Sequence, residues 1–421
     1  MLLYADLHTH SRYARACSSN ITIKAMRDQA LKKGVNLLSA GDFTNKEWLN
    51  ELKSNLIYEQ EGFYKLSEND SIYFVYGTEL ATNFDDGGKQ RAVHTVLLVS
   101  SYEIAEQIRD ALIGKGDLEN GRPELKISNE ELLDIIFSID ANAIVIPAHI
   151  WTPYFGALGE RSGFNSIEEA YGDKASKIFA IETGLSSDPL MNYYVSRLDR
   201  YTLLSNSDMH SLKNIGREAN VFNIEPSFKA LYAAIKSPID KLIYTIEFYP
   251  EEGKYHYDGH RRCSYSVNPL ETDDIICKIC GKRLTYGVLH RVKDLSDRKD
   301  PNQRPSRIRY IHTVPLYQII SYVLRSSEYS KKVNELYDKL ISTYGNEYKI
   351  LLDVSIEQIA SIDKEVAEAI SNIRENKIKI DPGYDGVYGK LELLPYRAEG
   401  DRDSKSRSSS IKDKQRKLFD Y

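Results

Sequence analysis

The stretch Met1-Leu-Leu-Tyr-Ala-Asp-Leu-His-Thr-His10 indicates how the fold begins. Its first seven residues are mostly apolar, and two histidines follow directly. We therefore expect a strand over residues 1–7, with both imidazoles just beyond its carboxyl end. This placement is typical of α/β proteins that collect their chemical groups at the ends of strands.

Residues 1 to about 238 alternate between strand-like and helix-like stretches. Such alternation predicts an α/β fold built from parallel βα units. We expect strands at 1–7, 35–40, 72–76, 93–99, 143–147, 178–182, 201–204 and 242–248, and helices at 23–33, 104–113 and 129–139.

Histidines and carboxylates recur at the ends of these expected strands. They are His8, His10, Asp42, Glu79, His149, Glu182, Asp208 and His210, while His94 begins its own strand. In a barrel the carboxyl ends of the strands share one face, so these side chains would meet there. A single histidine is commonly a hydrogen-bonded core residue, but this recurrence indicates a metal site. For Glu182 alone, a ligand role and a structural role both stay open.

The mixture of imidazole and carboxylate also predicts a chemistry. It suits divalent Zn, Mn or Fe, and carboxylates can bridge two ions. Such ions lower the pKa of a bound water and hold a phosphate oxygen. The pattern therefore favours an enzyme that hydrolyses phosphate esters.

Composition narrows the class of protein. The length of 421 residues favours two or three domains. A net charge of −5 argues against a protein whose whole surface binds nucleic acid, although a local basic groove remains compatible with this charge. No stretch approaches the roughly 20 apolar residues that span a bilayer, and the start lacks the features of a signal peptide. We expect a cytoplasmic monomer without membrane association, since no long coiled-coil seam is present.

Three of the four cysteines lie between residues 263 and 280. His260-Arg-Arg-Cys263 and Cys277-Lys-Ile-Cys280 are two ligand pairs, each with two intervening residues. This spacing predicts a closed, structural zinc ribbon with three cysteines and one histidine. His256 is an alternative fourth ligand, but its spacing to Cys263 is poorer. The alternative without a metal is that the three cysteines are scattered, buried core residues.

Beyond the ribbon pattern the chain becomes basic and then helical. Tyr286 and Tyr310 are interleaved with Lys282, Arg283, Arg291, Lys293, Arg298, Lys299, Arg304, Arg307 and Arg309. Cations for phosphate and aromatic faces for stacking suit a nucleic-acid groove, although a charge run is usually a solvated face. Residues 315–378 have helical spacing, and the polar segment beyond Arg397 predicts a disordered tail.

The ordered motifs Ala5-Asp-Leu-His-Thr-His10, Gly41-Asp42, Thr78-Glu79, Pro147-Ala-His149 and Ser207-Asp-Met-His210 resemble those of the polymerase and histidinol phosphatase (PHP) superfamily. The resemblance implies a distorted (β/α)7 barrel whose two or three divalent metals, Zn, Mn or Mg, cleave phosphoesters. It implies one metal on His8, His10, Glu79 and Asp208. A second would be held by Glu79, His94 and His149, and a third with help from Asp42 and His210. Asp208, His210 and Glu79 are the implied catalytic residues.

One segment departs from this pattern. Many members carry an acid or histidine shortly after His-x-His, and it serves the third metal. Here residues 11–17 read Ser-Arg-Tyr-Ala-Arg-Ala-Cys, without a carboxylate. Arg12 and Arg15 could instead meet a phosphate, or they could be solvated loop charges.

The order of barrel, ribbon and helical region, ending in Pro382-Gly-Tyr-Asp-Gly-Val-Tyr-Gly389, resembles the endonuclease Q family. The closest local matches are Ala5-Asp-Leu-His-Thr-His-Ser-Arg-Tyr13, Glu182-Thr-Gly-Leu-Ser186 and Leu204-Ser-Asn-Ser-Asp-Met-His-Ser211. Family members, found mainly in archaea, cut DNA 5′ of uracil, hypoxanthine or xanthine and at abasic sites. Their ribbon normally has four cysteines, and His260 takes the first place here.

The resemblance implies four regions. These are a PHP barrel over 1–248, a zinc ribbon over 249–300, a helical DNA-binding domain over 301–395, and a disordered tail over 396–421. It also implies base flipping and a nucleoid location. Expected DNA-binding residues are Arg12, Tyr13, Gly184, Arg261, Arg283, Arg307 and Arg309. The tail end, Gln415-Arg-Lys-Leu418-Phe419-Asp-Tyr421, resembles peptides of archaeal repair proteins that dock on the sliding clamp (PCNA).

Two alternatives stay open. A small-molecule phosphatase of the PHP superfamily would share the barrel but would leave the ribbon, the basic stretch and the tail unexplained. A catalytically dead protein that binds DNA or the clamp conflicts with the nearly complete set of ligands, although the missing third-site carboxylate is compatible with it.

Overall fold

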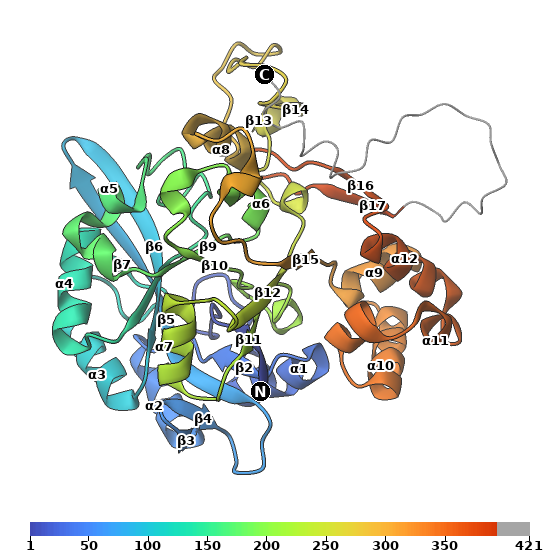
Figure 1. Cartoon of the computed structure of the whole chain (residues 1–421), viewed down its shortest axis with the longest axis horizontal. Coiled ribbons are helices and arrows are strands. Elements are labelled where there is room, and N and C mark those ends of the chain that lie inside the picture. The colour runs from blue at the N-terminus through green and yellow to red at the C-terminus, as the bar shows by residue number, and fades with distance from the viewer. Residues whose placement is uncertain (394–421) are drawn as a thin grey trace.

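The computed structural model describes residues 1–393, and the predicted disordered tail and clamp-binding peptide lie outside this range. Figure 1 shows an α/β body, a small β13–β14 module projecting from it, and a helical cluster, α9 to α12, at its side. The α/β fold class is confirmed. Within the described residues no helix combines the length and apolar character required to cross a membrane.

The body is built on one large mixed sheet. Its strands are β1 (Leu2–Asp6), β2 (Leu37–Ser39), β3 (Ile57–Gln60), β4 (Phe63–Lys65), β5 (Tyr73–Asp86), β6 (Lys89–Val99), β7 (Glu124–Leu125), β8 (Ile144–Pro147), β11 (Ala219–Asn223), β12 (Leu242–Glu247) and β15 (Tyr310–His312). A separate parallel pair consists of β9 (Ala180–Glu182) and β10 (Thr202–Leu204).

The prediction of parallel βα units is confirmed for β1, β2 and β5 and for the β9–β10 pair, but it is wrong for other parts of the sheet. β1 pairs in parallel with β2, but β11 runs antiparallel to β1 and to β12, and β5 and β6 form an antiparallel hairpin. Gly87 and Gly88, both at positive φ, make the only connection between β5 and β6. Two residues suffice for a hairpin, whereas a parallel crossover requires a dozen or more.

The body also holds α-helices between its strands, of which α3, α4 and α5 lie along the side away from the helical cluster (Figure 1). The helices are α1 (Ile23–Lys33), α2 (Lys46–Asn55), α3 (Tyr102–Ala111), α4 (Asn129–Ile139), α5 (Ile167–Tyr171), α6 (Pro189–Tyr193) and α7 (Phe228–Lys236). Several begin at a polar side chain that accepts a backbone N–H, as Thr22 and Ser128 do for α1 and α4. Such caps satisfy donors that the first turn leaves unpaired.

After β12 the chain enters the small module and then the helical cluster. The module holds β13 (Asp258–His260), β14 (Tyr265–Val267) and α8 (Val288–Leu295). The chain returns to the body at β15, which pairs in parallel with β12, and continues into α9 (Leu316–Val323), α10 (Lys331–Tyr344), α11 (Ile356–Ala360) and α12 (Lys364–Arg374). These helices bury a separate apolar core, and the helical prediction for 315–378 is confirmed.

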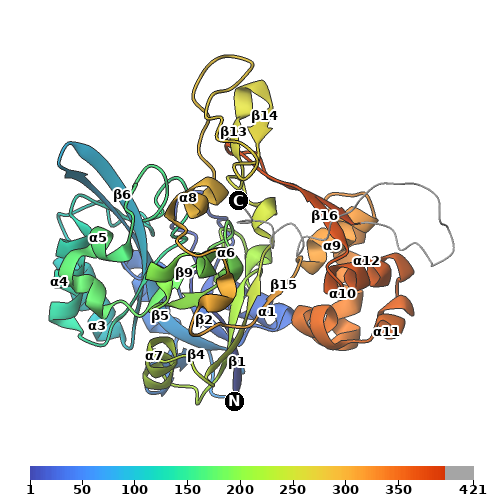
Figure 2. The same cartoon turned by 45° about the horizontal axis from the view of Figure 1, so that its top comes forward.

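The last described strands connect the helical cluster to the module. β16 (Ile378–Asp381) and β17 (Lys390–Leu393) form an antiparallel pair that reaches back toward β13 (Figure 2). In the connection between them, the amides of Gly383 and Gly389 donate to the carbonyls of Glu251 and Glu252. These backbone hydrogen bonds thus join the connection between β16 and β17 to the start of the module.

A buried ion pair joins the body to the helical cluster. Lys33 on α1 is fully buried, and its Nζ lies 2.9 Å from the Glu347 carboxylate. Glu347 also accepts from the Leu316 amide and the Tyr337 hydroxyl. The Lys33 ammonium and both Glu347 oxygens therefore have partners, which is the condition under which a buried charge is tolerated.

We predict that Lys33→Met costs about 3–5 kcal/mol of unfolding free energy, because it leaves a buried carboxylate without its counter-charge. Lys32, the neighbouring residue, pairs with Asp338 at the exposed surface. Lys32→Met is the matched control and should cost less than about 1 kcal/mol. Urea unfolding of both variants is the measurement, and equal losses would contradict a special role for the buried pair.

Burial raises the pKa of Glu252 to about 7, although Gln318 on α9 donates a hydrogen bond to it. Because the folded protein holds this proton more tightly than the unfolded chain, the contribution of protonated Glu252 to stability is fully present below pH about 4.5. This contribution is lost as the pH rises through about 7. Glu252→Gln should remove up to about 3 kcal/mol of the stability loss between pH 5 and pH 8. Thermal unfolding across this range tests it, and parallel profiles for the variant and the wild type would contradict it.

Candidate metal centre

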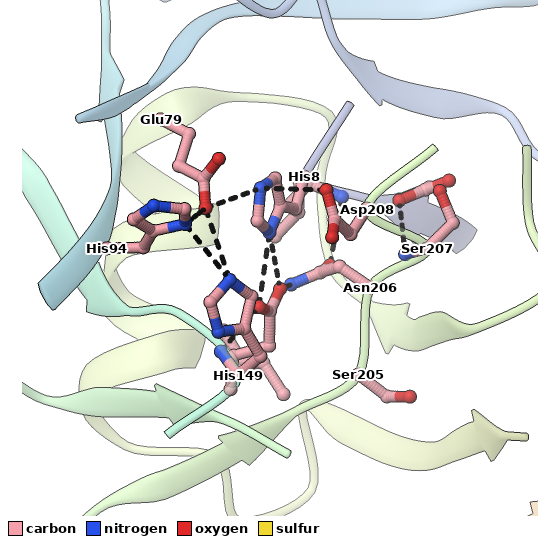
Figure 3. Close-up of polar contacts among 12 residues, drawn as sticks. His8, Glu79, His94, His149, Ser205, Asn206, Ser207 and Asp208 are labelled. Carbon is pink, nitrogen blue, oxygen red and sulfur yellow. Dashed lines mark hydrogen bonds and ion pairs between the residues drawn. The ribbon is translucent and has the colours of Figure 1, made fainter. Parts of the chain in front are cut away.

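Glu79 lies at the centre of a buried cluster of histidines (Figure 3). It comes from the middle of β5, opposite Val96 of β6. Its carboxylate lies 2.7 Å from His94 Nδ1, 3.3 Å from His149 Nε2, and 3.5 and 3.4 Å from the Nε2 atoms of His8 and His10. The hairpin thus contributes both the Glu79 carboxylate and the His94 imidazole, and it places them among imidazoles from other segments.

The first group of candidate ligands is His8, His10, Glu79 and Asp208. One atom from each lies within 4.8 Å of the others. His8 Nε2 is buried without a hydrogen-bond partner, 3.6 Å from Asp208 Oδ1. An unpaired nitrogen facing carboxylates fits a divalent cation between them, and the mixed nitrogen and oxygen donors suit Zn or Mn.

The second group is Glu79, His94 and His149, which are also mutually within 4.8 Å. Both histidines approach Glu79 Oε1, whereas His10 approaches Oε2. Because the two groups share Glu79, its carboxylate is placed to bridge two ions.

Glu182 and Asp42 hold imidazoles in place from behind. Glu182 lies 3.0 Å from His8 Nδ1 and accepts the His149 amide at 2.8 Å. Asp42 lies 2.9 Å from His10 Nδ1 and accepts the Ser11 amide. A carboxylate behind a ligating histidine fixes the tautomer and the ring orientation. Among the described residues Glu182 belongs to no metal-binding group, and its contacts fit the structural role of the two left open.

The residues expected to help with a third metal are placed differently. Within residues 1–393, neither Asp42 nor His210 belongs to a metal-binding group. His210 is partly exposed, its Nδ1 lies 2.9 Å from the Asp208 carbonyl, and its ring packs 4.8 Å from that of His10. Asp42 is engaged by His10 and Ser11, so its third-metal role stays a prediction.

The backbone is strained at three residues of the centre. Asp42, His149 and Asp208 all have positive φ, at 48°, 29° and 45°. L-residues rarely adopt this region, and such strain persists only where the surrounding structure enforces it. Each of these residues follows or ends a strand, so the strain turns its side chain into the cluster.

The buried charges set the protonation of the cluster. Burial lowers the pKa of His8, but Glu182, Glu79 and Asp208 raise it well above its ordinary value. Burial raises the pKa of Glu79, but His94 and His8 hold it well below its ordinary value. Glu79 is therefore an anion, which is the state that ligation requires, and cation binding would displace protons from the imidazoles.

Sequence reasoning missed Arg122. Its Nη1 lies 3.3 Å from Glu79 Oε2, and the side chain is mostly buried. Gly121 explains the approach of its loop, because a Cβ there would lie 2.6 Å from Asp42 Oδ2. The residue follows no predicted strand, so only the Gly-Arg-Pro turn could have indicated a special position.

A separate cluster lies in the small module. It consists of His260, Cys263, Cys277 and Cys280, within 4.8 Å of one another, as the two ligand pairs predict. Burial raises the pKa of the Cys277 thiol, but the amides of Cys280 and Ile279, with His260, lower it to about 6. A thiolate-rich set of four ligands fits tetrahedral zinc. His256, the alternative ligand, lies outside the group.

Comparison with known proteins places this geometry in a family. Endonuclease Q in complex with a 27-mer duplex carrying an abasic lesion is 30% identical, with a TM-score of 0.83 over 94% of this chain and 97% of that one. The chain belongs to the endonuclease Q family. The family's lesion-specific endonuclease from Pyrococcus furiosus is 29% identical, with a TM-score of 0.82 over 93% and 96% of the two chains. The predicted PHP-type fold is thereby confirmed.

Sequence relatives extend the family comparison. A family model described as the MJ0043 C-terminal domain matches residues 315–377. An uncharacterised protein of Methanocaldococcus jannaschii, MJ0043, is 34% identical over 248 residues, 56% of this chain and 31% of that protein. The uncharacterised YqxK of Bacillus subtilis is 28% identical over 93% of this chain and 99% of its own length. With a bacterial relative, the resemblance does not by itself indicate an archaeal source.

The expected DNA-binding residues differ in this protein in their exposure and in the side chains that they contact. Arg12 pairs with Glu51 and lies 5.1 Å from the ring centre of Tyr13. Gly184 is buried, and a Cβ there would lie 2.5 Å from the Cβ of His149, so packing alone requires glycine. The arginines have these contacts: the Arg261 amide donates to Asp385, Arg283 pairs with Glu160, Arg307 bonds Asn302, and Arg309 is exposed.

We predict that Cys277→Ser removes about one zinc ion per chain and lowers the melting temperature, because a closed structural site loses a thiolate. Mass spectrometry of metal content in the purified protein is the measurement. Cys17 lies outside the four-ligand group, so Cys17→Ser is the matched control and should keep its zinc. An unchanged zinc content in Cys277→Ser would show that this cluster is not the site.

Proposed function

We propose that this protein is a metal-dependent DNA repair endonuclease. It hydrolyses the phosphodiester on the 5′ side of uracil, hypoxanthine, xanthine or an abasic site. One observation carries the proposal: two ligand groups share Glu79 in a chain that aligns, over 94% of its length, with an endonuclease Q bound to lesion-containing DNA.

The ligand groups support hydrolysis. Divalent ions held by His8, His10, Glu79 and Asp208, and by Glu79, His94 and His149, would supply a water of lowered pKa and neutralise charge on the phosphate. Glu182 and Asp42 keep the imidazoles aimed at the ions.

Two side chains are placed to act on the phosphate itself. The partly exposed His210 ring is held beside Asp208 and packs against His10 of the first ligand group. Arg122 would donate hydrogen bonds to a non-bridging oxygen, a role that guanidinium groups perform well. In the proposal Asp208, His210 and Glu79 remain the catalytic residues, and Arg122 joins them.

Specificity for deaminated bases requires a pocket that distinguishes a carbonyl group from the amine that it replaces. Deamination replaces an exocyclic amine donor with a carbonyl acceptor, so backbone N–H donors would favour the lesion. The turn Thr183-Gly-Leu-Ser-Ser187 follows β9 and packs beside His149 through Gly184. We propose it as part of a pocket for an extruded base.

The remaining regions would hold DNA and a partner. We propose that the zinc ribbon of 249–300 and the helical region of 301–395 grip the duplex beside the barrel of 1–248, through Arg12, Tyr13, Arg261, Arg283, Arg307 and Arg309. Gln415, Leu418, Phe419 and Tyr421 would dock the monomer on a sliding clamp. A small-molecule phosphatase is disfavoured because it would share the barrel but leave the ribbon, the helical region and the tail without a role.

The test is nicking of end-labelled duplexes that contain deoxyuridine, deoxyinosine, an abasic site or only normal bases, with Mn²⁺ or Mg²⁺. We expect one nick 5′ of the altered nucleotide and none with EDTA. Asp208→Asn should lower the rate by more than about a hundredfold, because it changes a ligand. Asp338→Asn, an exposed position on α10, is the control and should cut normally.

Two outcomes would redirect the proposal. If every duplex survives while a small phosphomonoester is hydrolysed, the protein is a phosphatase. If neither is hydrolysed although Mn²⁺ binds and lesion DNA is retained, it is a binding protein without activity.

A further inference from the structure

The loop between β8 and α5 presents two aromatic side chains beside the metal centre. Tyr154 is 38% exposed and Phe155 is 40% exposed. Both follow His149, a candidate ligand at the end of β8, by only a few residues. Large aromatic side chains are usually buried, so an exposed pair next to a reactive centre requires an explanation.

Phe155 is held in a strained conformation. Its φ is 66°, a region that bulky residues rarely adopt. The strain is enforced locally, because the His94 amide donates to the Phe155 carbonyl at 2.9 Å. Gly156 allows the tight turn, since a Cβ there would lie 2.6 Å from the Thr152 carbonyl oxygen. The fold therefore keeps the ring in one exposed place against a backbone preference.

The loop is also joined to both ligands of the second group. The Phe155 ring stacks on His94, with centroids 4.3 Å apart and planes at 23°. Thr152 Oγ1 lies 2.9 Å from His149 Nδ1 and 2.9 Å from the Tyr154 carbonyl oxygen. His94 and His149 themselves lie side by side at Glu79 (Figure 3). The position of the aromatic pair is thus set relative to the candidate ligands His94 and His149.

Tyr154 extends the pair toward the small module. Its ring lies 5.7 Å from that of Tyr255, and the Arg161 guanidinium lies 5.3 Å from its centre. Arg291 of α8 donates to the Leu158 carbonyl in the same loop. The loop therefore spans from the metal centre to the base of the module and presents aromatic faces flanked by an arginine.

A simpler role for Phe155 would be to support His94 by packing. Support of this kind calls for a buried ring and gives no reason for a strained backbone or for the adjacent exposed Tyr154. A role in contact with DNA accounts for all three features. Successive bases rise about 3.4 Å along a duplex, so a ring stacked on a metal ligand is within reach of the base steps that flank the scissile phosphate.

We propose that Phe155, assisted by Tyr154, is a wedge that enters the DNA stack beside the lesion and occupies the space of the extruded nucleotide. This inference rests on the proposed function and deepens it. Apolar side chains inserted between base steps unstack them, and an aromatic face replaces part of the lost stacking. Extrusion of the lesion toward the cluster is favoured when the vacated place is filled.

The first test measures base unstacking directly. Duplexes carry 2-aminopurine next to deoxyuridine, and Asp208→Asn prevents cutting. Binding of this protein should raise the fluorescence, and the additional change Phe155→Ala should remove most of the rise. Phe155→Trp should keep it, because the aromatic face is retained. Tyr58→Ala removes an exposed aromatic side chain on β3 and is the control.

The second test separates a wedge from a support for His94, in proteins with Asp208 intact. Phe155→Ala should slow nicking of paired deoxyuridine by about tenfold or more. Deoxyuridine in a short unpaired bubble should be cut within about twofold of the wild-type rate, since it needs less extrusion. Mn²⁺ affinity by calorimetry should be unchanged.

Equal losses on both substrates, weaker Mn²⁺ binding, or an unchanged fluorescence rise would overturn the wedge and leave the proposed function standing. If the wild-type protein cuts neither substrate, the proposed function falls, and the wedge falls with it.

Discussion

The buried carboxylate of Glu79 is the constraint on which the rest of the structure depends. A fully buried anion is costly unless opposite charges or hydrogen-bond donors surround it. Here His94, His149, His8 and Arg122 all lie within 3.5 Å of it. They come from separate strands and loops, so the barrel must close with all of them in place. The same requirement creates a site for cations, which would replace protons in that role.

Side chains around the Glu79 cluster hold its histidines in position. Glu182 and Asp42 hold His8 and His10 from behind, while Thr152 contacts His149. The loop of Thr152 then carries its exposed aromatic pair to the edge of the centre. The candidate metal ligands, their orienting groups and the exposed aromatic pair are thus parts of one continuous set of contacts, which is why we expect them to act together.

The sequence predicted the ligands better than the sheet that holds them. The ribbon cluster was expected from its ligand spacing, and the two metal groups from the resemblance to the PHP superfamily, and the structure brings each set together. The β5–β6 hairpin was missed: the predicted strand at 72–76 continues through Glu79 to Asp86. Polar residues that face a buried site interrupt the apolar pattern, so the strand appeared to end early. Arg122 was missed because a loop arginine has no periodicity.

By itself, the sequence determined the α/β class, the helical region and which side chains could bind metals, since these follow from local pattern and ligand type. Only the tertiary structure showed that Glu182 and Asp42 contact the rings of His8 and His10, because these contacts join atoms that lie far apart along the chain. It alone placed Arg122 at Glu79 and Phe155 on His94. Positive φ at Asp42, His149 and Asp208 was likewise unreadable, because the surrounding fold, not the residue type, enforces such strain.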